Sequence, residues 1–156
     1  MEMNVNKYLF KGVKTDNIDQ VKDALEKGAD VNTRDEYGRT PLFFANFIIA
    51  KLLIDNGACI NATDEYGETA LFRQTIDVVG MLLRNGADVN VTNHCGETAI
   101  FNQTADAILF LIANGVNIYK KNCFSETFLH YEKIIGSKTA CEILNNYRKN
   151  IFIETV

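Results

Sequence analysis

The segment Asp35-Glu36-Tyr37-Gly38-Arg39-Thr40-Pro41-Leu42 decides the fold, because it recurs along the chain at a constant spacing. Related segments begin at Asp64 (Asp-Glu-Tyr-Gly-Glu-Thr-Ala-Leu), at Asn93 (Asn-His-Cys-Gly-Glu-Thr-Ala-Ile) and, more altered, at Asn122 (Asn-Cys-Phe-Ser-Glu-Thr-Phe-Leu). Each copy starts 29 residues after the one before. A period between about 20 and 50 residues is typical of a solenoid, in which each unit packs against its neighbours.

The composition predicts a single folded domain. A length of 156 residues is ordinary for one domain, and 47% apolar residues can form a core. The formal charge of −4 argues against nucleic acid or an anionic membrane surface as the partner. The residues after Met1 do not form a signal peptide, and no apolar run reaches the length of about 18 residues that a membrane helix needs. We expect a cytoplasmic protein that is monomeric by itself, with secretion or injection into another cell left open.

The four cysteines are predicted to be reduced. Cys59, Cys95, Cys123 and Cys141 form no C-x-x-C pair, and a disulfide framework is not expected in a chain of this kind.

Each full unit is predicted to contain two short helices behind a hairpin-like turn. In the unit that begins at Asp35, Thr40 is the predicted N-cap and Pro41 the first residue of an inner helix. An outer helix is expected over residues 49–56, where Asn56 and Gly57 end it. Few residues separate the start of the inner helix from Gly57, so both helices must be short and their connection tight. The predicted core positions are Leu42, Ala45, Ala50, Leu52, Leu53, Leu71, Phe72, Val78, Val79, Leu82, Leu83, Ile100, Phe101, Ala107, Ile108, Phe110 and Leu111.

The two ends of the chain are predicted to be capping units. Residues 6–34 lack the Gly-x-Thr-Pro-Leu opening but have helical apolar spacing over 7–15 and 18–27, with Gly28 as the helix stop. In residues 122–156 the repeat pattern decays. The single domain 1–156 is therefore divided into units 6–34, 35–63, 64–92, 93–121 and 122–156, and the atypical end units predict a complete small protein.

These segments resemble ankyrin repeats. Thr40-Pro41-Leu42-Phe43-Phe44-Ala45 is similar to the family's Thr-Pro-Leu-His-x-Ala segment, with phenylalanine at the histidine position. Residues 28–32 and 86–90 both match the family's Gly-Ala-Asp-Val-Asn segment, and residues 57–61 and 115–118 match it in part. The resemblance implies an all-α ankyrin-repeat solenoid of about five helix-turn-helix units with short β-hairpin-like turns.

Two departures from the family pattern affect the expected packing. The period of 29 residues is shorter than the usual 33. We also expect that no repeat keeps the family's histidine, which ties neighbouring turns together by hydrogen bonds. Packing of Phe43, Phe72 and Phe101 is expected to replace those bonds, and the curvature of the stack is expected to differ accordingly.

The resemblance implies protein binding through the concave face, which the turn tips and the exposed side of the inner helices form. A stiff extended surface of this kind loses little entropy on docking. The glutamates give this surface a negative character, so we expect a protein partner with a basic, partly apolar patch. The predicted partner-binding residues are Glu36, Tyr37, Arg39, Phe44, Glu65, Tyr66, Glu68, Arg73, His94, Cys95, Glu97, Asn102 and Phe124, with Cys123 and Glu126 on the same tips.

Structural roles compete with these assignments. Tyr37 and Tyr66 occupy the same offset and should lie side by side, where they either contact a partner or pack over their own turns. The glutamates are expected to be solvated surface groups more often than specific contacts. Phe44 lies next to a core position and fits either role.

Metal binding and catalysis find little support in the sequence. His94, Cys95 and Cys123 lie on adjacent tips, but a structural zinc needs four ligands and the sequence offers no clear fourth. A nucleophilic Cys-His pair would need a third group to orient it, and none accompanies His94 and Cys95. We therefore predict no metal, no cofactor and no enzyme activity.

Three classes of function follow from these observations. The first is a non-enzymatic protein-protein interaction module, possible forms of which include an inhibitor or immunity-like protein that covers its target. The second is a microbial effector that binds a host protein, for which the Asn- and Ile-rich composition is a weak indication. The third, an enzyme, is the least supported, because an ankyrin fold does not supply chemistry of its own.

Overall fold

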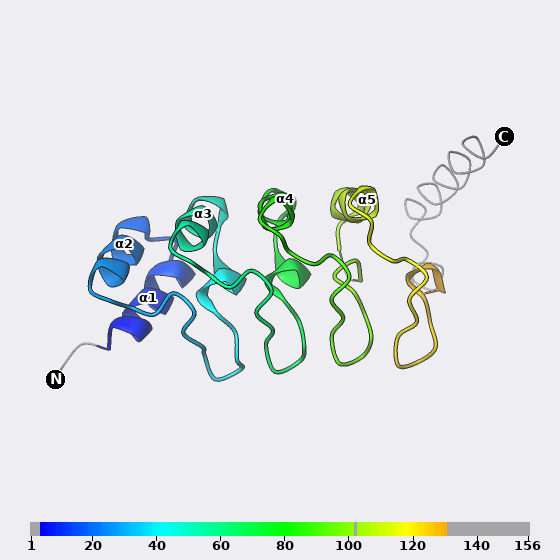
Figure 1. Cartoon of the computed structure of the whole chain (residues 1–156), viewed down its shortest axis with the longest axis horizontal. Helices are drawn as coiled ribbons and strands as arrows, with labels where there is room; N and C mark the ends of the chain where they lie inside the picture. The colour runs from blue at the N-terminus through cyan, green and yellow to red at the C-terminus, as the bar shows by residue number, and fades with distance from the viewer. Residues whose placement is uncertain (1–3, 102, 131–156) are drawn as a thin grey trace.

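The computed structural model describes residues 4–101 and 103–130 of the chain. The units follow one another in a row, with the outer helices along one edge and the hairpin tips along the opposite edge (Figure 1). Within these residues no helix is long and apolar enough to cross a membrane. The elements are α1 (Val5–Lys14), α2 (Ile18–Glu26), the 3-10 helix η1 (Pro41–Phe44), α3 (Phe47–Asp55), the 3-10 helix η2 (Ala70–Arg73), α4 (Ile76–Arg84) and α5 (Ala105–Ala113).

The N-terminal helix pair forms where the apolar spacing predicts it. Asn4 caps α1 by accepting the Lys7 N–H (3.0 Å), and Asn17 caps α2 by accepting the Gln20 N–H (2.9 Å). Gly28 follows the end of α2 with a φ of +83°, the left-handed conformation that glycine adopts without steric cost. The predicted helix bounds of 7–15 and 18–27 are therefore correct to within two residues.

The prediction that the inner helices are short is confirmed, and they are 3-10 turns rather than α-helices. η1 and η2 are single 3-10 turns of four residues each, and residues 99–101 of the next unit form only a turn. Thr40 precedes η1 and Pro41 begins it as predicted, but the Thr40 side chain makes no capping hydrogen bond. The four residues missing from the usual 33-residue period leave room for one turn only, and short runs are the normal length of a 3-10 helix.

The outer helices α3, α4 and α5 are equivalent nine-residue elements. Each ends at an asparagine and a glycine of positive φ, beginning with Asn56 and Gly57. The predicted start of α3 at residue 49 is two residues late, because the Asn46 side chain caps the helix by accepting the Ile49 N–H (2.9 Å).

The hairpin-like turns are confirmed, and each is built around one side chain. Asp35 Oδ1 accepts the N–H groups of Tyr37 and Arg39, both at 3.0 Å. The Asp35 N–H donates to the Arg39 carbonyl (2.9 Å), which closes the tip. Asp64, Asn93 and Asn122 make the equivalent side-chain and backbone bonds in the following tips.

Two rows of hydrogen bonds join successive units. At the tips, the Glu65 N–H donates to the Tyr37 carbonyl (3.0 Å), and His94 and Cys123 repeat this bond to Tyr66 and Cys95. In the segments that follow the outer helices, Asn61 Nδ2 donates to the Gly86 carbonyl (3.0 Å). The Oδ1 atom of Asn61 accepts the Asp88 N–H (2.9 Å). Asn32 and Asn90 make the same pair of bonds one unit earlier and one unit later. These bonds fix the relative position of neighbouring units.

The core lies between the inner turns and the outer helices. Most of the predicted core positions are buried, including Leu42, Ala45, Val78 and Leu82. The prediction overestimates the burial of four positions, which are only half-buried and pack against the edge of this core: Leu52, Phe72, Leu83 and Phe110.

The expectation that no repeat keeps the family's histidine is wrong. His130 stands three residues after Thr127, the same spacing as in Thr-Pro-Leu-His, and His130 Nδ1 lies 3.0 Å from Thr127 Oγ1 in a hydrogen bond. The surrounding Phe128 and Leu129 obscure the motif in the sequence. The buried hydroxyls of Thr69 and Thr98, whose units have phenylalanine at this position, have no hydrogen-bond partner. Phenylalanine packing thus fills the space of the histidine without replacing its bond.

Candidate protein-binding face

The hairpin tips and the exposed sides of the inner turns form one continuous surface, which we call the inner face. It comprises the tips 35–39, 64–68, 93–97 and 122–126, together with η1, η2 and the residues that follow them. The tips stand next to one another along one edge of the molecule (Figure 1). The predicted binding residues all lie on this surface except Asn102, which lies outside the described residues.

Aromatic side chains are exposed at the same position of three of the four tips. Tyr37 is 42% exposed, Tyr66 54% and Phe124 73%. Cys95 occupies the intervening position and is also exposed. The backbone bonds between tips place these residues in a row, as the constant offset predicts. Whether the row contacts a partner stays a prediction.

Arg39 and Phe44 belong to a cluster of alternating cations and aromatic rings at the N-terminal end of the inner face. The Arg39 guanidinium carbon lies 4.6 Å from the centre of the Tyr37 ring and 4.7 Å from that of Phe44. Lys14 Nζ lies 4.6 Å from the Phe44 ring, which meets the Phe10 ring edge to face at 6.2 Å. Phe44 is therefore half-buried among side chains of its own chain, and the cluster is a pre-formed part of the surface.

The charge of Arg39 is compensated within its own tip. Its Nε and Nη2 donate to Asp35 Oδ2 at 3.0 and 2.8 Å, and both side chains are largely buried. Burial alone raises the pKa of the Asp35 carboxyl, but the hydrogen bonds from Arg39 and from the tip backbone outweigh it and hold the pKa below its ordinary value. The Asp35–Arg39 pair thus rigidifies the first tip.

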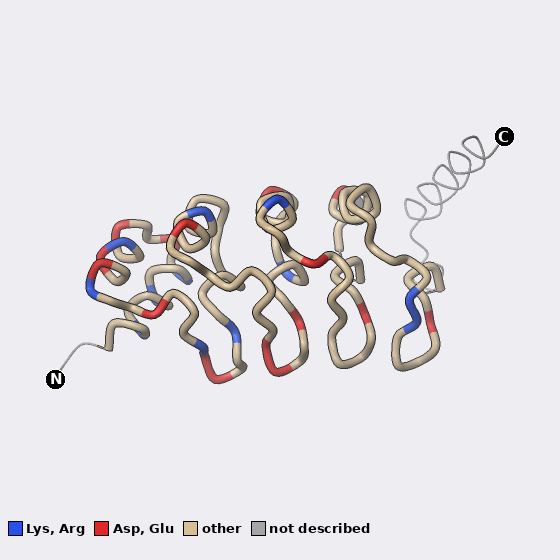
Figure 2. The backbone as a smooth tube through the Cα atoms, viewed as in Figure 1, with Lys and Arg blue, Asp and Glu red and all other residues tan. Residues whose placement is uncertain are grey.

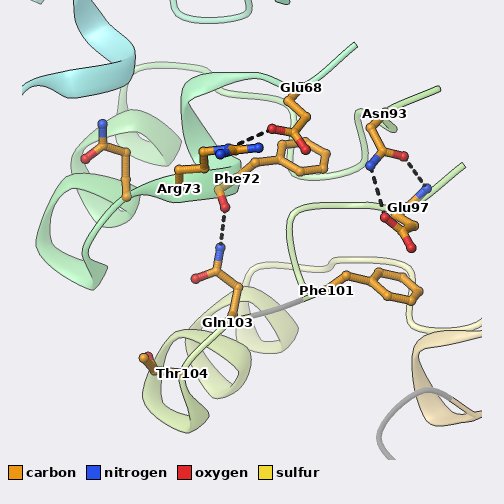
Figure 3. Close-up of a pocket in the computed structure, with 9 residues that line it drawn as sticks. Glu68, Phe72, Arg73, Asn93, Glu97, Phe101, Gln103 and Thr104 are labelled. Carbon is orange, nitrogen blue, oxygen red and sulfur yellow. Dashed lines mark hydrogen bonds and ion pairs between the residues drawn. The ribbon is translucent and has the colours of Figure 1, made fainter. Parts of the chain in front are cut away.

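A hollow of about 420 Å³ opens on the inner face between units 64–92 and 93–121 (Figure 3). Arg73 Nε donates to Glu68 Oε2 (2.9 Å), a bond that raises the pKa of Arg73. Only 15% of the Glu68 side chain is exposed, against 63% of the Arg73 side chain. The residues that line the hollow are Glu68, Phe72, Arg73, Gln74, Asn93, Glu97, Phe101, Gln103 and Thr104.

Two glutamines replace the hydrogen bonds of the missing helical turn. Gln74 Nε2 donates to the carbonyls of Leu42 (3.1 Å) and Phe43 (2.8 Å), which end η1. Gln103 Nε2 donates in the same way to the carbonyls of Leu71 and Phe72 one unit later. A carbonyl at the end of a short helix lacks an intrahelical donor, and the glutamine N–H groups supply it. Sequence reasoning missed these residues, although their 29-residue spacing marks them as a repeated feature.

The comparison with protein families agrees with this architecture. The description "Ankyrin repeats (3 copies)" matches residues 9–93, which is more than half of the chain. The chain belongs to the ankyrin-repeat family. The three matched copies are fewer than the five units that we expected, and the units that begin at Asn93 and Asn122 lie beyond the matched residues. A comparison with curated proteins finds no match. Ankyrin repeats are protein-protein interaction modules, so the coarse function follows from membership of the family.

The inner face of this ankyrin-repeat protein is not uniformly negative, because basic residues lie at the first and last tips. The tip of unit 64–92 carries Glu65 and Glu68, whereas Arg34 and Arg39 flank the preceding tip and Lys121 leads into the last one (Figure 2). The expectation that the glutamates are free surface groups is wrong for two of them. Glu68 pairs with Arg73, and Glu97 Oε2 accepts a bond from Asn93 Nδ2 (3.0 Å). Glu36 and Glu65 are exposed as expected.

The cysteines of adjacent ankyrin tips lie next to each other. The Cys123 N–H donates to the Cys95 carbonyl (2.6 Å), and a hydrogen bond between the two thiols raises the pKa of Cys95. His94 stands beside them at an exposed position. Within residues 4–101 and 103–130, no three His, Cys, Asp or Glu side chains are placed to hold a metal ion.

Proposed function

We propose that this ankyrin-repeat protein binds one protein partner through its inner face, with the row of exposed aromatic side chains at the centre of the contact. The observation that carries the proposal is the exposure of Tyr37, Tyr66 and Phe124 at the same position of three of the four tips. Rigid aromatic residues contribute a large share of binding energy in protein interfaces, because they bury much area with few rotatable bonds.

The row is supported by a backbone that is already ordered. Each tip is closed by its own Asp or Asn side chain, and each is tied to its neighbour by a backbone hydrogen bond. A surface that is ordered before binding loses less conformational entropy when a partner docks. The inner face therefore favours tight binding of a folded partner.

The chemistry of the face indicates the kind of partner. Exposed tyrosines next to Glu36 and Glu65 on the first two tips of the row complement a surface that is basic and partly apolar. An inhibitor or immunity-like role is the simplest form of such binding, because a stiff face that covers a target's active site blocks it without chemistry of its own.

An affinity capture from the lysate of the protein's own cell, followed by mass spectrometry, tests the proposal. We expect one stoichiometric protein that the Tyr37→Ala/Tyr66→Ala variant fails to retain. The matched control is Ile48→Ala on α3, because Ile48 is a more exposed apolar side chain (62%) than either tyrosine but belongs to an outer helix. Capture that is unchanged in the tyrosine variant, or lost equally in the Ile48 variant, would contradict the proposed face.

The same experiment separates the two finer roles. An inhibitor requires that the captured protein lose its activity in the complex and regain it with the tyrosine variant. If the native lysate gives no partner and the lysate of a host or competitor does, the effector interpretation replaces the inhibitor.

A further inference from the structure

We propose that the hollow between units 64–92 and 93–121 receives one arginine side chain of the protein partner, with Glu97 as its principal ligand. The inference rests on the proposed function, since it assigns the residue type that fills one position of the inner face. Four features of the hollow support it: a positioned carboxylate, two glutamine amide oxygens, two aromatic rings and the charge balance.

Glu97 is a carboxylate held in place without a cation. Asn93 Nδ2 donates to Glu97 Oε2 (3.0 Å), and Asn93 Oδ1 accepts the backbone N–H of Glu97 (3.0 Å), so Asn93 positions both the backbone and the carboxylate of Glu97 (Figure 3). In the part of the chain that the structure describes, Glu97 forms no salt bridge, and it is half-buried. A carboxylate accepts several hydrogen bonds, so it has capacity for a guanidinium beside the bond from Asn93.

Apart from Arg73, which donates to Glu68, two glutamines of the hollow are placed to act as acceptors. The Nε2 atoms of Gln74 and Gln103 are engaged by backbone carbonyls, which leaves their amide oxygens to accept further bonds. Figure 3 shows the bond from Gln103 to the Phe72 carbonyl. Arginine carries five N–H donors and no acceptor, and it is the side chain whose bonding capacity complements such a set. Phe72 and Phe101 line the same hollow and offer apolar contact to the aliphatic stem.

The charges of the side chains that line the hollow leave one negative charge to be balanced by a cation. Glu68 and Glu97 each contribute a negative charge, and Arg73 compensates Glu68 through the bond of 2.9 Å. One negative charge, that of Glu97, therefore remains for an incoming side chain. The volume of about 420 Å³ is within the range of pockets that hold small ligands, and one long side chain fits it.

The chain itself shows how this surface holds a guanidinium. One unit earlier, Arg39 is bound by the Asp35 carboxylate at 2.8 and 3.0 Å and stacks between the rings of Tyr37 and Phe44. The hollow offers the same two components, a carboxylate and aromatic rings, without an arginine of this chain on Glu97. A partner's arginine would reproduce there the arrangement that Arg39 makes internally.

The test is a titration of the ¹⁵N-labelled full chain with Nα-acetyl-arginine amide, followed by NMR. We expect saturable shifts confined to the lining residues, with a dissociation constant on the order of 1–10 mM for so small a probe. Nα-acetyl-citrulline amide has nearly the same shape without the charge and should bind at least about tenfold more weakly, since its bonds to a carboxylate are not charge-assisted. Nα-acetyl-lysine amide should also bind more weakly. Equal shifts with citrulline or lysine, or shifts centred on the Phe44 cluster, would overturn the assignment.

Glu97→Gln is the matching variant, because its side-chain oxygen can still accept the bond from Asn93. We expect it to weaken binding of the arginine probe by about fivefold or more. Glu126→Gln is the control, because Glu126 has the same position in the next tip and does not line the hollow. Equal effects of the two substitutions would overturn the proposal.

The outcome for the hollow can be separated from the outcome for the whole face. If a captured partner depends on Tyr37 and Tyr66 but binds Glu97→Gln with unchanged affinity, the arginine assignment fails while the proposed function stands. If the arginine probe binds the hollow as expected but the tyrosine variant retains its partner, the proposed face fails instead.

Discussion

Thr127 and His130 form a hydrogen bond of 3.0 Å, whereas the equivalent hydroxyls of Thr69 and Thr98 are buried without any partner. The difference follows from one position, which is histidine in the last unit and phenylalanine in the two before it. A buried hydroxyl without a partner carries a desolvation cost, so the internal units are less stable than their packing alone suggests.

Replacement of these threonines by valine should therefore have opposite effects. Thr69→Val removes an unsatisfied hydroxyl at constant shape, and we expect it to raise the free energy of unfolding by about 1 kcal/mol. Thr127→Val removes the bond to His130 and should lower it by about 0.5–1.5 kcal/mol. Urea denaturation at pH 7 measures both. Two destabilising effects of similar size would mean that Thr69 has a partner in solution.

Phe72→His should restore the family's bond inside the stack. The histidine would stand three residues after Thr69, as His130 stands after Thr127, and half-buried Phe72 leaves room for the smaller ring. The expected coupling between positions 69 and 72 is about 1 kcal/mol, measured in a double-mutant cycle with Thr69→Val. Additive effects in the cycle would show that the bond does not form. The absolute stability of Phe72→His alone is less informative, since lost packing offsets the gain.

The sequence was sufficient for the architecture because the fold is made of local features that repeat. The 29-residue spacing, the Asp or Asn of each tip and the Asn-Gly helix ends each act within one unit, so their positions predict the turns and the outer helices. The inner helices were predicted to be short, because few residues remain between two fixed ends, but the spacing did not predict that they would be 3-10 turns. His130 was missed because the residues around it differ from the family segment.

The binding face was predictable only in part, because the repeat spacing predicts features that recur in each unit but not individual side-chain contacts. Tyr37, Tyr66 and Phe124 share one offset, and a shared offset in a solenoid gives a row. The hollow depends instead on Gln103 reaching back to η2 and on Glu97 being turned toward Asn93. The contact of Gln103 joins two units, and the direction of the Glu97 side chain is set within its tip by Asn93, so the repeat spacing predicts neither.

The row formed by Asn32, Asn61 and Asn90, in the segments that follow the outer helices, should contribute much of the stability of the contacts between units. Asn61→Ala leaves the Gly86 carbonyl and the Asp88 N–H without their shared partner, and we expect a loss of about 1–3 kcal/mol. Asn56→Ala is the control, since the Asn56 side chain donates only to Leu52 within its own unit, and it should cost less than half as much. Circular dichroism during urea denaturation measures both. Similar losses would argue that solvent replaces the inter-unit bonds.

The Asp35–Arg39 pair should make stability depend on pH in the acid range. The pKa of Asp35 is lowered in the folded protein, so its contribution is fully present above the ordinary value of 3.8 and is lost as the pH falls through the lower folded value. Asp35→Asn keeps an acceptor for the tip, as Asn93 does, but loses the charge. We expect it to cost about 1–2 kcal/mol at pH 7 and progressively less below pH 3.8.

The exposed pair Lys51–Asp55 provides the comparison for this effect. Both side chains are more than half exposed, so Asp55→Asn should change stability by less than about 0.5 kcal/mol at pH 7. Denaturant unfolding at intervals between pH 7 and pH 3 gives the two profiles. An Asp35→Asn profile parallel to that of the unmodified protein would show that the pair does not contribute to acid sensitivity.

Cys95 should become more reactive when its neighbour is removed. The hydrogen bond and charge of Cys123 raise the pKa of Cys95, so at pH 8 a smaller fraction of Cys95 is the reactive thiolate. In a background of Cys59→Ser and Cys141→Ser, we expect Cys123→Ala to move the midpoint of the alkylation rate against pH to lower pH and to speed iodoacetamide labelling of Cys95 at pH 8. Glu97→Gln removes a smaller contribution of the same sign and should produce a smaller shift in the same direction. Peptide mass spectrometry resolves Cys95 from Cys123 in the parent protein. A larger shift for Glu97→Gln than for Cys123→Ala would mean that the carboxylate, rather than the adjacent thiol, is the main influence on the pKa of Cys95.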